Sequence, residues 1–223
     1  MSNLGFIHRF VPSPSSDKVN GKANADSKNK QQHPLTLLML HGTGGDENDL
    51  VPLGQMLDPS AALLSPRGKV MEKGMSRFFR RLSEGVFDLD DLKFRTQELG
   101  MFLRKASSQY SFDLNNTVAV GFSNGANIAA SLLLLVPETI KGAILFRAMV
   151  PFIPDNPPDL LDKKVLLSAG VFDPIVSKDQ TESLLNILQK SRADVSLKWQ
   201  RSGHNLTEAD IIESKKWLSE KIN

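Results

Sequence analysis

One stretch of sequence decides the fold: Thr117-Val-Ala-Val-Gly-Phe-Ser-Asn-Gly-Ala-Asn-Ile-Ala-Ala-Ser-Leu132. Its first six residues form a nearly continuous apolar run of strand length, and an apolar helical pattern follows Ser123. Between them, Gly121-Phe122-Ser123-Asn124-Gly125 has the form G-x-S-x-G, which places a reactive serine on a sharp turn between strand and helix. The alternative is a Gly-Ser turn that only caps the following helix. We expect Ser123 to be a nucleophile.

The rest of the chain repeats the alternation of strands and helices. Strands are predicted at residues 35–40, 117–122, 142–146, 165–169 and 195–199, with a further short apolar run at 61–64. Helical patterns lie at residues 46–57, 90–110, 124–135, 178–191 and 207–222. Strands that are apolar throughout and alternate with helices predict a mostly parallel sheet covered on both faces. The expected fold is therefore a doubly wound α/β domain.

The distribution of apolar segments predicts the domain organisation. Residues 1–34 hold one short predicted strand, 6–11, and a polar stretch from 12 to 34 that we interpret as a flexible surface insert. Residues 35–223 are expected to form a single catalytic domain. The strand and helix pattern uses nearly all of that range, which leaves no room for a separate cap domain.

Composition excludes several classes of protein and site. The 223 residues include 27 basic and 25 acidic side chains, and this small excess of positive charge does not favour a nucleic-acid partner. There is no cysteine, so disulfides and thiolate catalysis are excluded. No apolar run approaches the ~18 residues of a membrane span. The first residues lack the apolar core of a signal peptide, and we expect a cytoplasmic protein.

A glycine-rich turn, Leu40-His41-Gly42-Thr43-Gly44-Gly45-Asp46, follows the strand predicted at 35–40. Such a turn can direct backbone N–H groups at a developing oxyanion. We assign one donor to the amide of Thr43 and the other to the amide of Asn124. The rival interpretation is a phosphate-binding loop, but the Gly-Lys-Ser/Thr ending of that motif is absent. His41 is expected to support the turn and not to act as a base.

Two further strand ends carry an acid and a base. Asp173 lies in the sequence Ala169-Gly-Val-Phe-Asp-Pro174, directly after a predicted buried strand. The other candidate aspartates do not directly follow such a strand, namely Asp155, Asp159, Asp162, Asp179 and Asp194. His204 follows the last predicted strand, in Gly203-His204-Asn205, whereas His8 and His33 lie in the N-terminal segment. The order Ser123, Asp173, His204 suits a catalytic triad.

At these motifs the chain resembles the α/β-hydrolase superfamily, in its phospholipase/carboxylesterase branch, which includes acyl-protein thioesterases. A closer likeness, to bacterial methylhydroquinone-responsive hydrolases, is carried by residues 65–68, 72–82, 84–88 and 121–132. The resemblance implies the α/β-hydrolase fold and an esterase that uses no metal or cofactor. It also implies a triad of Ser123, Asp173 and His204, with Thr43 and Asn124 in the oxyanion hole.

The predicted function is a serine carboxylesterase that hydrolyses small-molecule esters through an acyl-enzyme on Ser123. An acyl-thioesterase or a lysophospholipase is the alternative, because the same site serves any acyl carbonyl. A hydrolase-fold protein that binds a small molecule without chemistry is the non-enzymatic alternative. The expected assembly is a monomer or a homodimer.

Some features bear on substrate preference. Phe146-Arg147 occupies a position near the acyl pocket where the closer relatives carry histidine, which leaves substrate preference open. Residues 67–87 and 149–158 are the segments expected to flank the pocket. Their apolar side chains are equally compatible with cleft walls and with core, namely Phe78, Phe79, Met149 and Phe152.

Overall fold

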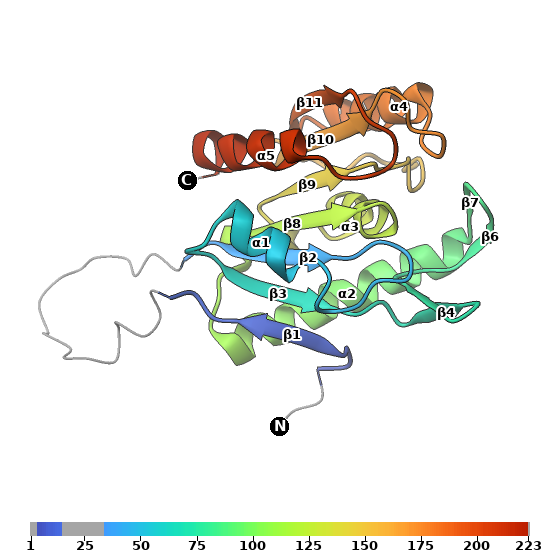
Figure 1. Ribbon diagram of the computed structural model, residues 1–223. Helices are drawn as coiled ribbons and strands as arrows, with labels where there is room; N and C mark the ends of the chain where they lie inside the picture. Colours follow the sequence, from blue (N-terminus) through green and yellow to red (C-terminus); the bar gives the residue numbers. More distant parts are fainter. Residues whose placement is uncertain (1–3, 15–33, 223) are drawn as a thin grey trace, which may run out of the picture.

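The computed structural model describes residues 4–14 and 34–222, which form a central sheet with helices on both faces (Figure 1). The seven-stranded sheet has the order β1-β3-β2-β8-β9-β10-β11. Every neighbouring pair is parallel except β1 and β3 at one edge. The strands are β1 His8–Val11, β2 Thr36–Leu40, β3 Ala62–Pro66, β8 Thr117–Phe122, β9 Gly142–Phe146, β10 Lys164–Gly170 and β11 Asp194–Gln200. The mostly parallel α/β sheet is as predicted.

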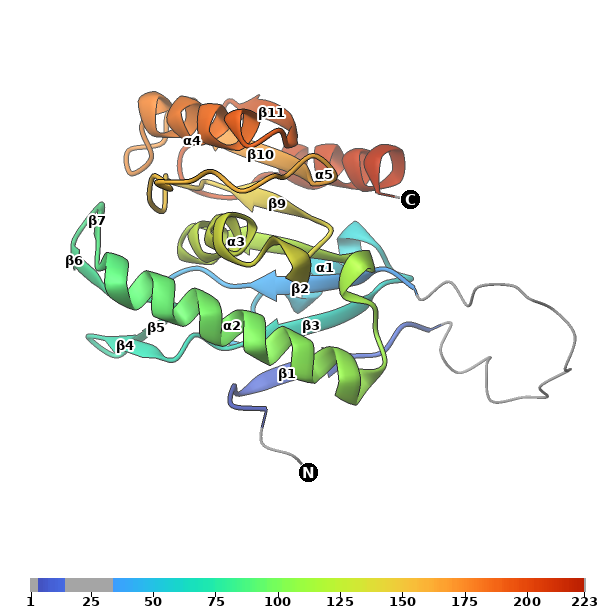
Figure 2. The ribbon, with the colours of Figure 1, turned by 180° about the vertical axis from the view of Figure 1, so that it is seen from behind.

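The helices divide between the two faces of the sheet. Helices α1 (Val51–Leu57) and α5 (Glu208–Lys221) cover the face seen in Figure 1. Helices α2 (Leu89–Tyr110), α3 (Asn124–Leu135) and α4 (Lys178–Lys190) cover the other, seen in Figure 2. Alternate strand residues feed two separate cores, as period-two side-chain placement requires. For example, Leu38 packs toward α2 and α3, and Met39 packs toward α1 and α5.

Two small β-hairpins lie beside the carboxyl ends of the parallel strands. The first joins β4 (Val70–Glu72) to β5 (Met75–Arg77), and the second joins β6 (Arg81–Ser83) to β7 (Val86–Phe87). The sequence pattern did not predict these strands. They form the segment that was expected to flank the pocket, and the described residues contain no larger cap. No helix in residues 4–14 or 34–222 is long and apolar enough to span a membrane.

Several element boundaries differ from the sequence prediction, most of them by one or two residues. The first strand begins at His8, and α1 begins at Val51 because residues 47–50 form a turn. Pro52 lies in the first turn of α1, where an N–H group has no intrahelical partner to lose. Most of the predicted insert at 12–34 lies outside the described residues. The division at residue 35 therefore stays a prediction.

The sharp turn at Ser123 explains the two glycines of the G-x-S-x-G motif. Ser123 has a φ of 53°, in the left-handed region that non-glycine residues rarely occupy. A Cβ at Gly125 would lie within 3.0 Å of the carbonyl groups of Leu40 and His41, and one at Gly121 would collide with the backbone of Gly125. Strand β2, the turn and α3 can pack this closely only because neither glycine has a side chain.

We predict that Gly125→Ala destabilises the protein by about 1–3 kcal/mol or more, because backbone atoms cannot move aside as a side chain can. Gly100→Ala is the matched control, since its added Cβ lies in the middle of α2 and meets mainly side-chain atoms. The control should stay within ~1 kcal/mol of wild type, close to the helix-propensity difference between the two residues. Urea unfolding measures both variants, and equal stabilities would contradict the packing argument.

Candidate active site

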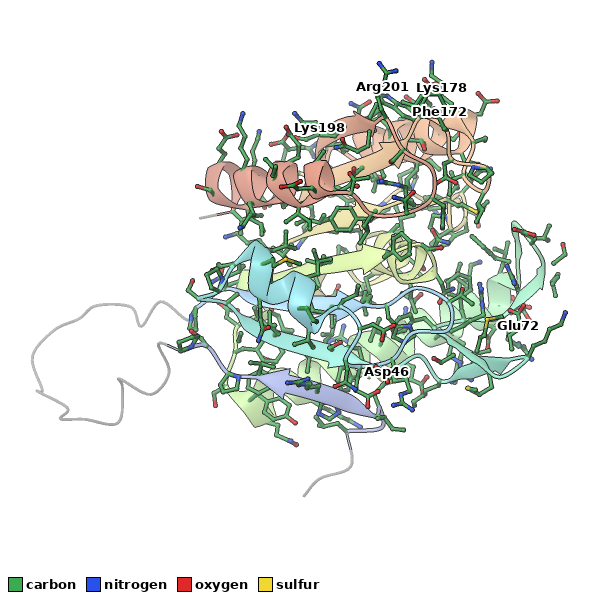
Figure 3. The ribbon with its side chains drawn as sticks, in the orientation of Figure 1. Asp46, Glu72, Phe172, Lys178, Lys198 and Arg201 are labelled. Carbon is green, nitrogen blue, oxygen red and sulfur yellow. The ribbon has the colours of Figure 1, made fainter. Side chains whose placement is uncertain are left out.

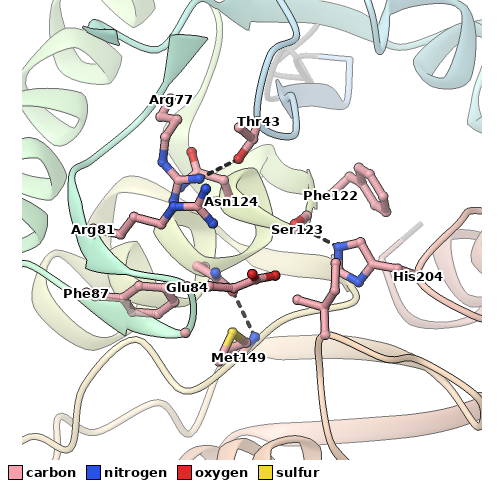
Figure 4. Close-up of a pocket in the computed structure, with 13 residues that line it drawn as sticks. Thr43, Arg77, Arg81, Glu84, Phe87, Phe122, Ser123, Asn124, Met149 and His204 are labelled. Carbon is pink, nitrogen blue, oxygen red and sulfur yellow. Dashed lines mark hydrogen bonds between the residues drawn. The ribbon is translucent and has the colours of Figure 1, made fainter. Parts of the chain in front are cut away.

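The carboxyl ends of strands β8, β10 and β11 bring Ser123, Asp173 and His204 into one hydrogen-bonded chain. Ser123 follows β8, Asp173 follows β10, and His204 follows β11. The Nε2 atom of His204 lies 2.9 Å from Oγ of Ser123, and its Nδ1 atom lies 2.8 Å from Oδ2 of Asp173. Figure 4 shows Ser123 and His204 facing each other in a cleft. The structure thus brings the three predicted residues together, with His204 between Ser123 and Asp173.

Hydrogen bonds around Asp173 hold its side chain in place beside His204. The Asp173 side chain is almost fully buried, and its Oδ1 atom accepts N–H bonds from Ile175 (2.8 Å) and Val176 (3.0 Å). The carboxylate leaves Oδ2 as an acceptor, so Nδ1 of His204 carries a proton. In neutral His204, Nε2 is then free to accept the Ser123 hydroxyl proton.

Asn124, one of the two predicted oxyanion donors, is the first residue of α3. Its N–H group has no intrahelical partner, as for the first N–H groups of any helix. Its buried side chain is held by the backbone, because Oδ1 accepts a 2.7 Å bond from the N–H of Phe78. Among the described residues, Nδ2 of Asn124 has no hydrogen-bond partner. The backbone N–H of Asn124 therefore lies next to Ser123 on the turn that begins α3.

The loop that carries Thr43 is tied to strand β5. The Gly44 N–H donates to the carbonyl of Ser76 at 2.9 Å, and the Ser76 hydroxyl donates to the carbonyl of Gly45. Arg77 donates to the Thr43 hydroxyl at 2.6 Å. The sequence gives no sign of these hydrogen bonds, because nothing in the local pattern of residues 75–78 indicates contact with a loop some thirty positions earlier.

His41 supports the same loop from the other side, as the sequence analysis expected. The Gly68 N–H donates to Nε2 of His41 at 2.9 Å, so Nδ1 carries the proton and donates to the carbonyl of Gly42 at 2.6 Å. Burial lowers the pKa of His41 and outweighs the opposing effect of the Gly42 hydrogen bond. His41 is thus a neutral structural histidine.

A cleft of about 280 Å³ opens over Ser123 and His204. Of the four candidate wall residues, only Met149 lines it; Phe78, Phe79 and Phe152 are buried in the core shared with α2 and α3. Arg147 also does not line the cleft, contrary to its expected place near the acyl pocket. The rest of the apolar lining comes from residues that were not among the four candidates, namely Phe87, Phe122 and Ile175.

Charged side chains line one wall of the cleft, mainly from the β-hairpins. Arg77 and Arg81 both contact the carboxylate of Glu72, at 3.3 and 2.9 Å (Figure 3 labels Glu72 on its hairpin). Burial, together with the neighbouring charge of Arg81, lowers the pKa of Arg77, although Glu72 opposes the shift. Glu84 borders the cleft as well (Figure 4). The single carboxylate of Glu72 therefore faces both guanidinium groups.

No group of three or more histidine or acidic side chains is arranged to hold a metal ion within the described parts of the chain.

The chain is similar to known hydrolases over most of its length. No protein-family model matches the sequence. MhqD of Bacillus subtilis (strain 168), which is named as a hydrolase, is 48% identical over 186 residues, covering 83% of this chain and 93% of MhqD. The Bacillus cereus carboxylesterase structure aligns with a TM-score of 0.88 and 43% identity, over 98% of this chain and 96% of its own. YahD, solved with malic acid, aligns with a TM-score of 0.84 and 28% identity, over 97% and 99%.

We predict that His41 makes stability depend on pH in a defined direction. Because the pKa of His41 is lowered on folding, the unfolded chain takes up the proton first as the pH falls. The contribution of His41 to the free energy of unfolding is fully present above pH ~6.5, the ordinary pKa of an imidazole. That contribution declines as the pH drops below this value. The measurement is urea unfolding at pH 7.5 and 5.5 for wild type and His41→Gln. The variant should lose less stability between the two values, and equal losses would contradict the assignment.

Proposed function

Because the chain belongs to the α/β-hydrolase superfamily, in the phospholipase/carboxylesterase branch with MhqD, we propose that it is a serine carboxylesterase. Its substrates are small carboxylic esters, cleaved through an acyl-enzyme on Ser123. The observation that carries this proposal is the continuous hydrogen-bonded chain from Ser123 through His204 to Asp173. Similarity to the Bacillus cereus carboxylesterase supports the same reaction class.

The proposed reaction has two half-cycles with the same proton carrier. His204 Nε2 takes the Ser123 proton as Oγ attacks the ester carbonyl carbon, and the imidazolium then gives that proton to the departing alkoxide. Water next attacks the acyl carbon, loses a proton to Nε2, and the acid leaves as Ser123 regains its proton. The buried Asp173 carboxylate stabilises the imidazolium in both half-cycles.

The amides of Thr43 and Asn124 are the proposed donors to the oxyanion in each tetrahedral intermediate. Such donors act strongly because they are already oriented before charge develops, and one donor typically contributes about 3 kcal/mol to the transition state. Arg77 at the end of β5 donates to the Thr43 hydroxyl, and the next residue, Phe78, donates its N–H to the Asn124 side chain. One segment of chain therefore fixes both residues whose backbone N–H groups are the proposed donors. Neither loop needs to reorganise during the reaction.

Two alternatives use the same cleft. A thioesterase or lysophospholipase would use the same triad on a different acyl donor. A comparison of a small ester, a thioester and a lysophospholipid as substrates separates the three activities. A protein that binds a small molecule without chemistry would leave Ser123 unreactive. Treatment with a fluorophosphonate probe and intact-mass analysis distinguishes this case, because only an activated serine gains the phosphonyl mass.

We predict that Ser123→Ala lowers kcat for p-nitrophenyl butyrate by about 10⁴-fold or more, since the nucleophile is lost while the fold is kept. Ser108→Ala is the control, because Ser108 is exposed on α2 and bonds only to the carbonyl of Arg104 among the described partners. The control should keep full activity, and thermal unfolding checks that both variants are folded. A Ser123→Ala protein with over a tenth of wild-type kcat would remove Ser123 from the mechanism.

We also predict that kcat/KM for p-nitrophenyl esters peaks between acetyl and hexanoyl. The cleft lies at the lower end of the usual size range for ligand sites, and hairpins form its outer wall. Each methylene that finds room gains ~0.8 kcal/mol of binding, and further methylenes stay in water. The measurement is a chain-length series below the micelle limit of the long esters. A maximum at decanoyl or beyond would favour the thioesterase or lysophospholipase alternative.

A further inference from the structure

Arg147 is a fully buried arginine directly after β9, and its backbone is strained. Its side chain has 0% exposure, and its φ of 56° lies in the left-handed region. Removing a guanidinium from water is costly unless hydrogen bonds and an opposite charge compensate for it. A residue that is both buried with its charge and strained in its backbone persists only where the surrounding contacts fix it. The contacts of Arg147 therefore show which parts of the structure it connects.

The Arg147 guanidinium donates hydrogen bonds to the loop that carries His204, on both sides of that residue. Its Nε donates to the carbonyl of Gly203 at 3.1 Å, and one terminal nitrogen donates to the carbonyl of Asn205 at 2.8 Å. The same nitrogen donates to the Ser202 hydroxyl at 3.0 Å. Three acceptors that flank His204, on residues 202, 203 and 205, are therefore held by one planar group, whose donors have a rigid geometry.

Asp210 fixes the guanidinium in turn. The pair is bidentate, with N···O distances of 2.9 and 2.8 Å. The Asp210 carboxylate also accepts bonds from the Ser168 hydroxyl (2.5 Å) and from the Thr207 N–H (2.8 Å) that begins α5. Burial raises the pKa of Asp210, but the hydrogen bonds from Arg147, Ser168 and Thr207 outweigh burial and lower it. Asp210 is thus an anion that joins β10, α5 and Arg147.

The same place in the fold also anchors the other two loops of the site. The Ser123 N–H donates at 2.9 Å to the carbonyl of Phe146, the residue before Arg147. The Phe172 N–H, in the loop of the predicted triad acid, donates at 3.0 Å to the carbonyl of Ser202, whose hydroxyl Arg147 holds. Arg147 therefore stands where the serine, acid and base loops meet.

We propose that Arg147, held by Asp210, is the positioning residue that sets the place of His204 between Ser123 and Asp173. The inference rests on the proposed hydrolase function. Arg147 does not contact the cleft, so it acts through the loop and not on the substrate. Misplacement of a catalytic group by ~1 Å can cost about 10²-fold in rate. Loss of the pair should consequently lower kcat and leave KM nearly unchanged.

The principal variant is Arg147→Met/Asp210→Asn, which removes both charges together and keeps a side-chain acceptor for the start of α5. We expect kcat for p-nitrophenyl butyrate to fall about 10²-fold, with KM within about twofold. Inactivation by a fluorophosphonate should slow by a similar factor, because it depends on the same activated serine. Arg192→Met/Asp159→Asn is the matched control at an exposed Arg–Asp pair, and it should change neither value.

A folded double variant that keeps more than a third of wild-type kcat would overturn the proposal, as would a change confined to KM. A cooperative unfolding transition establishes that the variant is folded. If the double variant does not fold, Arg147→Lys decides the question. Lysine keeps a charge for Asp210 but lacks the planar fork that reaches both carbonyls beside His204. It should lose about tenfold in kcat, and full activity would contradict the positioning role.

A spectroscopic measurement separates this proposal from the proposed function. The proton between Nδ1 of His204 and Asp173 gives a downfield ¹H NMR signal when that hydrogen bond is well ordered. We expect the signal in wild type, in the surface control and in Ser123→Ala, and its loss or broadening in the Arg147 variants. If Ser123→Ala keeps activity, the proposed function fails while this result still tests positioning. An unchanged signal in the folded double variant would contradict positioning alone.

Discussion

The left-handed backbone of Ser123 is the constraint on which the site depends. A strained residue of this kind costs about 1–3 kcal/mol, so the surrounding contacts must hold it in place. The Ser123 N–H donates to β9, its carbonyl accepts the Asn127 N–H in α3, and Gly125 allows the turn to touch β2. The turn exposes the hydroxyl at the carboxyl edge of the sheet. Strand order then decides which loops can reach it.

Precision at this edge comes from contacts that lie behind the reacting groups. On one side, the hairpin strand β5 holds the Thr43 loop, and the N–H of Phe78, directly after β5, holds the Asn124 side chain. On the other side, the buried Arg147–Asp210 pair holds the backbone around His204. Both supports use arginines whose side chains are almost completely buried.

Much of the fold followed from the sequence because its signals are local. The apolar runs at residues 35–40 and 117–122 are buried on both faces, and their length alone identifies them as strands. Asp173 and His204 could be chosen because each follows a predicted strand, and parallel strands end at one edge. These inferences needed no knowledge of which residues touch across the molecule.

The missed features either give a weak local signal or depend on contacts between distant segments. The hairpin strands at 70–87 are only two or three residues long and partly exposed, so they give no periodic signal. The sequence leaves Phe78 and Phe152 equally compatible with cleft walls and with core, and packing against α2 and α3 places both in the core. Arg147 looked like a specificity residue, although its partners Gly203 and Asp210 lie more than fifty positions away.

The central claim is that Ser123 carries the acyl group during turnover. Its most direct test is an acid quench of the protein during steady-state hydrolysis of p-nitrophenyl butyrate, followed by intact-mass analysis and peptide mapping. The account predicts a mass increase of one butyryl group, located on Ser123 and absent from Ser123→Ala. An acyl group on another residue, or continued turnover by Ser123→Ala, would contradict it.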